Sequence, residues 1–179
     1  MAIEIIGIDG DDTLWHSEGH FHVTEQAYVE LLAPWVDAVT ASAALLESER
    51  RNLAVFGYGV KGFTLSMIET ALTLTDHRID GVHIQRIISM GKELLTHPVE
   101  LLDGVAETID VLRRDHRLVL ITKGDLFHQE SKVAASGVSE LFERIEIVAE
   151  KDTPTYARVV GAMGAAPTGF CMIANSVRS

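Results

Sequence analysis

The chain of 179 residues contains 47% apolar and 23% charged residues, which is typical of a folded globular protein and excludes a disordered one. This length suits one domain, or a compact core with a modest second lobe. The formal net charge of −11 argues against nonspecific binding to nucleic acid or to anionic membranes, and the single cysteine excludes a disulfide framework.

The N-terminal residues enter a strand pattern directly, without a signal-like segment, and no apolar run is long enough to span a bilayer. We therefore expect a cytoplasmic protein that contacts neither membranes nor nucleic acid. Cys171 lies inside an apolar run, so we expect it to be a buried, small hydrophobic residue.

A short buried strand is expected over residues 3–8, because an apolar run there ends at a group of carboxylates. Residues 16–98 differ in character, since apolar side chains recur there at helical spacing and nothing alternates like a strand. Breaks occur at Pro34, at the glycine-rich segment 57–62 and at Asp80-Gly81. The four expected helices cover residues 20–33, 40–56, 62–76 and 82–96.

After Pro98, amphipathic helices alternate with continuous apolar strands, a pattern typical of a parallel sheet covered on both faces. We predict an α/β fold in which residues 1–15 and 99–179 form a doubly wound, Rossmann-like sheet and residues 16–98 form an inserted all-helical domain. The expected helices are 104–114, 129–135 and 155–163, and the expected strands are 118–122, 145–148 and 169–174.

Polar side chains follow the strands at the edge where open α/β sheets bind ligands. Asp9, Asp11 and Asp12 crowd together after the first strand, Thr122 ends the second, and Lys151 follows the third. Because like charges repel, we expect a positive partner there, namely Mg²⁺ together with Lys151. The oxygen-only ligand set disfavours zinc and copper. The residues therefore predict a site for an anion and a metal.

Residues 9–14, DGDDTL, resemble the DxDxT motif of the haloacid dehalogenase superfamily of phosphohydrolases. Thr122 in LVLIT and Lys151 in VAEKDTPTY resemble its second and third motifs, and the inserted helices resemble its helical cap. The resemblance covers essentially the whole chain. It implies a sheet with the first strand central, the second and third strands on one side and the fourth on the other.

The resemblance implies that Asp9 is the nucleophile that forms an aspartyl-phosphate, and that Asp11 protonates the leaving alkoxide and then activates water. Thr122 and Lys151 would hold the phosphoryl oxygens, with the Lys123 N–H as a further contact. Mg²⁺ would be bound by the Asp9 carboxylate and the Asp11 carbonyl. The implied function is Mg²⁺-dependent hydrolysis of a small phosphorylated metabolite by a monomer or homodimer.

Three further residues have weaker signals. Lys61, in the glycine-rich segment, is the best candidate to meet a second anionic group of the substrate, although the sequence somewhat favours an exposed helix–helix turn for this segment. Trp15 is expected to line the substrate pocket, and Lys132 to lie on a solvated helix face.

Two positions depart from the family pattern. Asp12 stands where glycine is common, and we expect the turn to tolerate it because aspartate adopts turn conformations readily. Asn175 stands at the first acidic position of the fourth motif, and the second acidic position lies beyond Ser179. We therefore expect a shortened chain whose metal site is incomplete and whose C-terminal strand and helix are missing.

Other functions share parts of this pattern. A haloacid dehalogenase needs no proton donor for its leaving group, so Asp11 argues against it, whereas a phosphomutase uses both aspartates. A receiver-type phospho-switch carries its acceptor aspartate after a middle strand, where this chain has Thr122 or Glu150. A non-catalytic relative remains an alternative. Taken singly, the aspartates could form a solvated turn, Thr122 a turn cap, and Lys151 a surface lysine.

Overall fold

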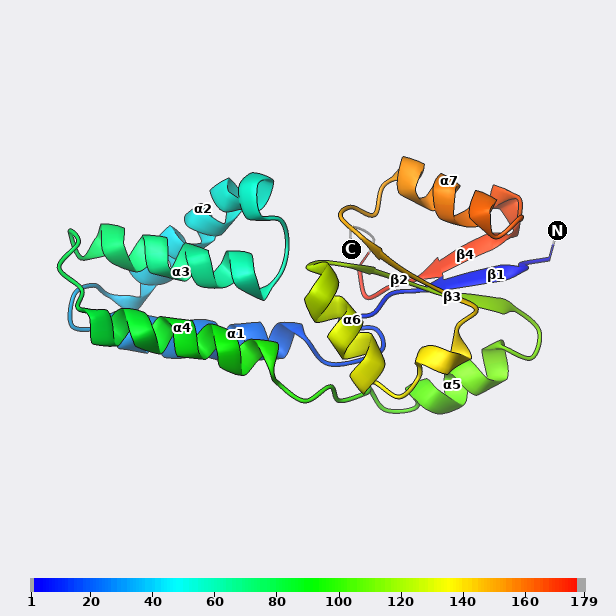
Figure 1. Ribbon diagram of the computed structural model, residues 1–179, viewed down its shortest axis with the longest axis horizontal. Helices are drawn as coiled ribbons and strands as arrows, with labels where there is room; N and C mark the ends of the chain where they lie inside the picture. Colours follow the sequence, from blue (N-terminus) through cyan, green and yellow to red (C-terminus); the bar gives the residue numbers. More distant parts are fainter. Residues whose placement is uncertain (1, 177–179) are drawn as a thin grey trace. The chain divides into compact units, whose positions relative to one another are not determined.

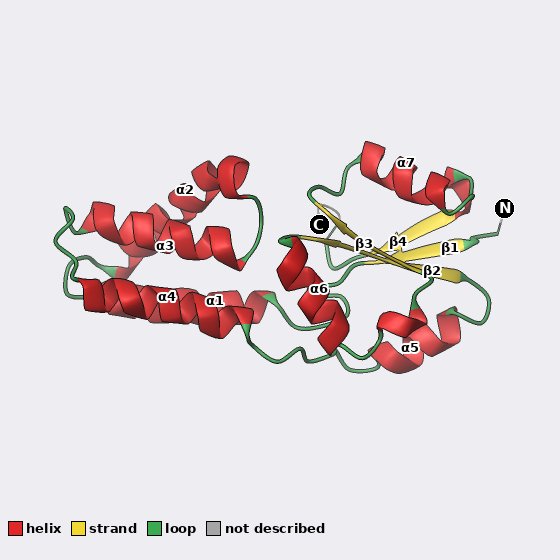
Figure 2. Ribbon diagram, in the orientation of Figure 1, coloured by secondary structure: helices red, strands yellow, loops and turns green. Residues whose placement is uncertain are grey.

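Four parallel strands form one sheet in the order β3-β2-β1-β4 (Figure 2). The computed structural model describes residues 2–176 of the chain. The position of β1 between β2 and β4 confirms the predicted strand order, and Gly7 of β1 pairs with Val119 and Met172 on its two sides. The strands are β1 (Ile5–Ile8), β2 (Arg117–Lys123), β3 (Arg144–Val148) and β4 (Phe170–Ile173).

Helices cover both faces of this sheet, as the continuous apolar strands predicted (Figure 1). Successive residues of a strand point to opposite faces. Leu118 and Leu120 therefore pack in one cluster with the side chains of α5 (Val105–Leu112) and α6 (Leu126–Ala135). Val119 and Ile121 pack in a second cluster with α7 (Thr153–Ala162). The predicted doubly wound α/β fold is confirmed.

The chain divides into two compact units. The sheet unit joins the chain up to Glu18 with the chain from Pro98 onward, and the helical unit is Gly19–His97. The helical unit has its own apolar core, in which the Tyr28 hydroxyl donates to the carbonyl of Met67 at 3.0 Å. Within residues 2–176, no helix combines the length and apolar character that crossing a membrane requires. The helices are α1 (Glu18–Leu32), α2 (Ala38–Phe56), α3 (Val60–Leu74) and α4 (Gly81–Leu95).

Six of the predicted helices begin one to three residues before the predicted positions, and aspartate side chains cap the N-termini of four of them. The clearest case is α6, predicted to begin at residue 129, which begins at Leu126 because the Asp125 carboxylate accepts a hydrogen bond from the N–H of His128. This earlier start moves one more helical turn to the carboxyl edge of the sheet. The capping residues are Asp37, Asp80, Asp125 and Asp152.

The edge strand β4 is less buried than its apolar sequence suggested. Phe170 and Met172 pack against the α7 side of the sheet, and the alternating residues Cys171 and Ile173 are exposed. The prediction that Cys171 is buried was therefore wrong, because strand alternation turns its side chain away from that cluster.

Glu146 on β3 lies between two arginines. We therefore predict that its contribution to the free energy of unfolding depends on pH. Its carboxylate accepts from Arg144 Nε at 2.5 Å and Arg158 Nη2 at 2.9 Å. Burial raises the pKa of Glu146, but the two guanidinium groups outweigh this and hold the pKa below its ordinary value. We expect Glu146→Gln to lower the free energy of unfolding by about 1 kcal/mol at neutral pH.

The sign of the pH effect follows from that lowered pKa. The stabilisation is present above the pKa that Glu146 has in the unfolded chain, and it is lost as the pH falls through its folded pKa. Urea unfolding of the wild type and of Glu146→Gln across this acidic range measures the difference. A difference that stays constant on acidification would contradict the assignment.

Candidate active site

The loop after β1 forms a tight turn that keeps two aspartates at the carboxyl edge of the sheet. The carbonyl of Gly10 accepts from the N–H groups of Thr13 at 3.2 Å and Leu14 at 2.7 Å. A Cβ at position 10 would lie 2.7 Å from Cζ2 of Trp15 and 3.0 Å from Oγ1 of Thr122. This close approach requires glycine, and it brings the first loop against the end of β2.

Asp9 and Lys151 form a buried ion pair. Asp9 Oδ1 accepts from Lys151 Nζ at 2.5 Å and from the Gly10 N–H at 2.7 Å. The side chains of Lys151 and Asp9 are only 3% and 5% exposed. Burial lowers the pKa of the Lys151 ammonium, and the neighbouring Asp9 opposes this shift without cancelling it. Two residues predicted for the site thus lie in direct contact, 142 positions apart in the chain.

Thr122, at the end of β2, presents a hydroxyl that has no protein partner. The residue is fully buried, and its Oγ1 makes no hydrogen bond within the described part of the chain. Buried polar atoms are nearly always paired with protein or ordered water, so this hydroxyl is free to donate to a water or to a ligand oxygen. Thr122 lies beside Gly10, and the sequence resemblance implied that Thr122 would hold a phosphoryl oxygen.

Asp11 is held by three donors, one of which corrects a prediction. Lys132 was expected on a solvated helix face, but its Nζ lies 2.5 Å from Asp11 Oδ1. Trp15 Nε1 donates to the same oxygen at 2.6 Å, and Gln129 Nε2 donates to Oδ2 at 2.9 Å. Burial raises the pKa of Asp11, but the charge of Lys132 and the three hydrogen bonds outweigh it and leave this pKa below its ordinary value.

The two remaining lysines predicted to bind substrate have different surroundings. Lys123 ends β2 and its Nζ lies 3.7 Å from Glu150 Oε2, so its side chain stays at the same edge of the sheet. Lys61 belongs to the helical unit, where it is exposed in the first turn of α3.

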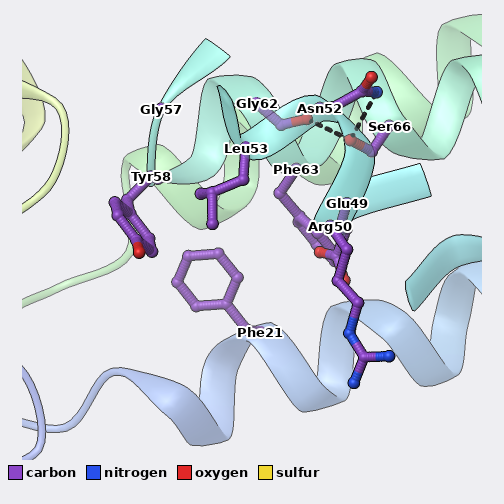
Figure 3. Close-up of a pocket in the computed structure, with 11 residues that line it drawn as sticks. Phe21, Glu49, Arg50, Asn52, Leu53, Gly57, Tyr58, Gly62, Phe63 and Ser66 are labelled. Carbon is purple, nitrogen blue, oxygen red and sulfur yellow. Dashed lines mark hydrogen bonds between the residues drawn. The ribbon is translucent and has the colours of Figure 1, made fainter. Parts of the chain in front are cut away.

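The helical unit contains a pocket beside the predicted glycine-rich segment (Figure 3). Its volume is about 240 Å³, and the rings of Phe21 and Phe63, which line it, have centroids 5.4 Å apart. Burial, together with the charge of Glu25, raises the pKa of Glu49 in its wall. Lys61 does not line this pocket. The lining residues are Phe21, Glu49, Arg50, Asn52, Leu53, Gly57, Tyr58, Gly59, Gly62, Phe63 and Ser66.

The carboxylates at the sheet edge fit a magnesium ion better than a transition metal. Within residues 2–176, no three or more His, Cys, Asp or Glu side chains are grouped to hold a metal by themselves. Mg²⁺ needs no such group, since it binds one or two carboxylates together with water and phosphate oxygens. Within residues 2–176, both hydrogen-bond donors to Asp9 contact Oδ1, so neither of them occupies Oδ2.

Asp12 connects the loop after β1 to the first helix. Its φ of 56° is in the left-handed region, which aspartate tolerates, as the sequence predicted for this departure from glycine. Its carboxylate accepts from the N–H groups of Ser17 at 2.9 Å and Glu18 at 3.0 Å, where α1 begins. The end of β4 also contacts this loop, because the N–H of Asn175 donates to Thr13 Oγ1 at 2.9 Å.

Comparisons with known proteins identify the relatives of this chain. The family model of the haloacid dehalogenase-like hydrolases matches residues 3–177. A solved haloacid dehalogenase-like family hydrolase from Xanthomonas campestris is similar with a TM-score of 0.94 and 51% identity, over 99% of this chain and 75% of that one. No protein with a curated description matches the sequence.

Two more distant structures share the fold. A predicted phosphoglycolate phosphatase from Haemophilus somnus 129PT has a TM-score of 0.60 and 15% identity, over 95% of this chain and 76% of its own. A 2-haloacid dehalogenase from Pseudomonas syringae pv. tomato DC3000 has a TM-score of 0.61 and 18% identity, with the same coverage of 95% and 76%. The fold therefore accommodates both chemistries, and only the site residues can distinguish them.

The conformation of Asp12 predicts a rank order of stabilities. Asp12→Ala loses the helix cap and places Cβ of an alanine in the left-handed region, which together lower the free energy of unfolding by about 2 kcal/mol. Asp12→Gly loses only the cap and should cost about half as much. Urea unfolding of the three proteins measures the order, and an alanine variant at least as stable as the glycine variant would refute this explanation.

The buried pair of Asp9 and Lys151 predicts strong coupling between two substitutions. Lys151→Met leaves the Asp9 carboxylate buried without its cation, so the variant should lose about 3 kcal/mol of unfolding free energy. Adding Asp9→Asn to this variant should cost less than Asp9→Asn costs in the wild type. The four proteins are compared by urea unfolding in Mg²⁺-free buffer. Additive losses would show that the pair contributes no coupling.

Proposed function

Because the chain belongs to the haloacid dehalogenase-like hydrolases, we propose that it is a Mg²⁺-dependent phosphomonoester hydrolase acting on a small phosphorylated metabolite. One observation carries this proposal: the orphaned Thr122 hydroxyl is buried beside the loop that holds the paired Asp9 and Lys151. A phosphoryl group supplies the acceptor oxygen that this hydroxyl lacks, and it can also accept from the Lys151 ammonium, which has three donors and uses one on Asp9. The motif residues that resemble this family thus each have a task in the proposed reaction.

In the first step, Asp9 Oδ2 attacks phosphorus while the bond to the leaving oxygen breaks. Asp9 Oδ1 stays hydrogen-bonded to the Gly10 N–H, which orients the carboxylate for this attack. Lys151 and Thr122 stabilise the charge on the phosphoryl oxygens. Asp11 gives its proton to the leaving alkoxide, so an alcohol is released and Asp9 carries the phosphoryl group.

In the second step, Asp11 takes a proton from water as the water oxygen attacks the same phosphorus. The bond between phosphorus and Asp9 breaks, which releases inorganic phosphate and restores the Asp9 carboxylate. The Asp9 carboxylate and the Asp11 carbonyl would hold Mg²⁺, whose charge lowers the repulsion between the phosphate and the aspartates. Lys123, with Glu150 beside it, contributes its N–H at the same edge.

The contacts of Asp11 favour a phosphatase over a dehalogenase. Displacing a halide from carbon requires no proton for the leaving group, so a second acid two residues after the nucleophile would have no use there. In this chain Asp11 is held by three donors, as a group with a fixed task would be. We further propose that Lys61 meets a second anionic group of the substrate, so phosphate esters that carry a carboxylate belong in the substrate panel.

The proposal predicts Mg²⁺-dependent release of inorganic phosphate that depends on Asp9. A panel of sugar phosphates, nucleotides, carboxylate-bearing phosphate esters and p-nitrophenyl phosphate is tested with and without Mg²⁺. We expect Asp9→Asn to abolish turnover, because an amide cannot attack phosphorus. Absence of turnover by the wild type with Mg²⁺ across the panel would refute the phosphatase assignment, and halide release from 2-haloacids would replace it by a dehalogenase.

Thr122 provides a matched pair of variants for the observation that carries the proposal. Thr122→Val removes the hydroxyl at nearly constant volume, and kcat/KM should fall about 10-fold or more because one donor to the phosphoryl group is lost. Thr122→Ser keeps the hydroxyl and should retain most of the activity. Equal activity of the two variants would show that the hydroxyl does not bind the phosphoryl group.

A further inference from the structure

The carboxylate of Asp11 is fixed through both oxygens by side chains from two elements. Oδ1 accepts from Lys132 Nζ at 2.5 Å and from Trp15 Nε1 at 2.6 Å. Oδ2 accepts from Gln129 Nε2 at 2.9 Å. Gln129 and Lys132 lie three residues apart on α6, so they share one face of that helix. Three donors on one carboxylate leave it little freedom to rotate.

Each donor is itself anchored. Trp15 is completely buried in the core of the sheet unit, and the Gln129 amide also donates to the carbonyl of Lys123 at 2.9 Å. Gly124, with φ of 144°, allows this approach, because a Cβ there would lie 2.9 Å from Gln129 Nε2. The Lys132 side chain is only 12% exposed. Lysines buried to this extent usually have a specific partner, which here is Asp11.

We propose that Lys132 is a positioning residue for Asp11, which it aligns with the leaving group of the substrate; this inference rests on the proposed function. A carboxylate oxygen offers about two acceptor sites, and Lys132 and Trp15 occupy both sites of Oδ1. From residues 2–176, Oδ2 accepts only the Gln129 hydrogen bond and keeps one site. Oδ2 is therefore the oxygen that exchanges the proton.

The proton balance follows from this assignment. In the first step, the proton on Asp11 Oδ2 passes to the leaving oxygen as the bond between phosphorus and that oxygen breaks. In the second step, Oδ2 takes a proton from water as the water oxygen bonds to phosphorus and Asp9 leaves. Lys132 keeps its own proton throughout and acts only through its contact with Asp11.

The test compares leaving groups, because a misplaced acid matters only where the leaving group needs a proton. Lys132→Met removes the ammonium at similar length, Lys132→Arg keeps a cationic donor, and Lys92→Met makes the same exchange at an exposed position of α4. Enzyme in excess is mixed with an alkyl phosphate or with p-nitrophenyl phosphate, and release of the alcohol or phenol is followed over a single turnover. This isolates the first step from the second, which all esters share.

We expect Lys132→Met to slow release of the alkyl alcohol by about 100-fold and release of p-nitrophenol by less than about 10-fold, with KM for each ester nearly unchanged. Lys132→Arg should recover part of the loss, and Lys92→Met should behave as the wild type. Equal losses for both esters, or no loss, would overturn the positioning role. So would a crystal structure of Lys132→Met in which the Asp11 carboxylate has not moved, a result that needs no activity.

Failure of this inference differs from failure of the proposed function. If the wild type releases phosphate and Lys132→Met does so equally well with both esters, only the role of Lys132 is lost. If the wild type releases no phosphate from any ester, the phosphatase assignment is lost and the role of Lys132 falls with it.

Discussion

The buried contact between Asp9 and Lys151 is the interaction on which the carboxyl edge of the sheet depends. Neither charge is stable there alone, since removing a carboxylate or an ammonium from water costs several kcal/mol even after relaxation. Each compensates the other only while β1 and β3 keep their register on either side of β2. The position of this ion pair is therefore fixed by the sheet itself.

A second pair extends the same principle. Asp11 would add negative charge beside Asp9, and Lys132 supplies the positive charge that makes this tolerable. Asp9 and Asp11 thus have one lysine each, from different parts of the chain. These separate cations are consistent with the separate roles proposed for the two aspartates, as nucleophile and as proton carrier.

The sequence predicted the fold, and it named several residues that the structure brings together at one edge of the sheet, because those signals are local. Apolar runs gave the strands, helical spacing gave the helices, and polar residues after the strands marked Asp9, Asp11, Thr122 and Lys151. The family model over residues 3–177 confirms the resemblance that these residues carried. The roles of the individual residues, and the assignment of residues 16–98 as a cap domain, remain predictions.

Lys132 escaped prediction because its partner is distant in the sequence. Residues 129–135 were predicted to form a helix, and nothing within that segment distinguishes a solvated face from one that meets the first loop. In the structure, Gln129 and Lys132 share a face of α6 with the buried Val133. Asp11 lies 121 positions before Lys132, so only the folded arrangement brings the two side chains together.

The choice between phosphate and halide chemistry rests on side chains that the fold does not dictate. The phosphatase and the dehalogenase that resemble this chain have nearly equal TM-scores of 0.60 and 0.61. The two reactions differ in whether the leaving group needs a proton. An enzyme whose leaving group needs no proton gains nothing from a second, fixed carboxylate in the loop after β1. Trp15, Gln129 and Lys132 all donate to Asp11, so three residues outside the recognised motifs support the proposed phosphatase chemistry.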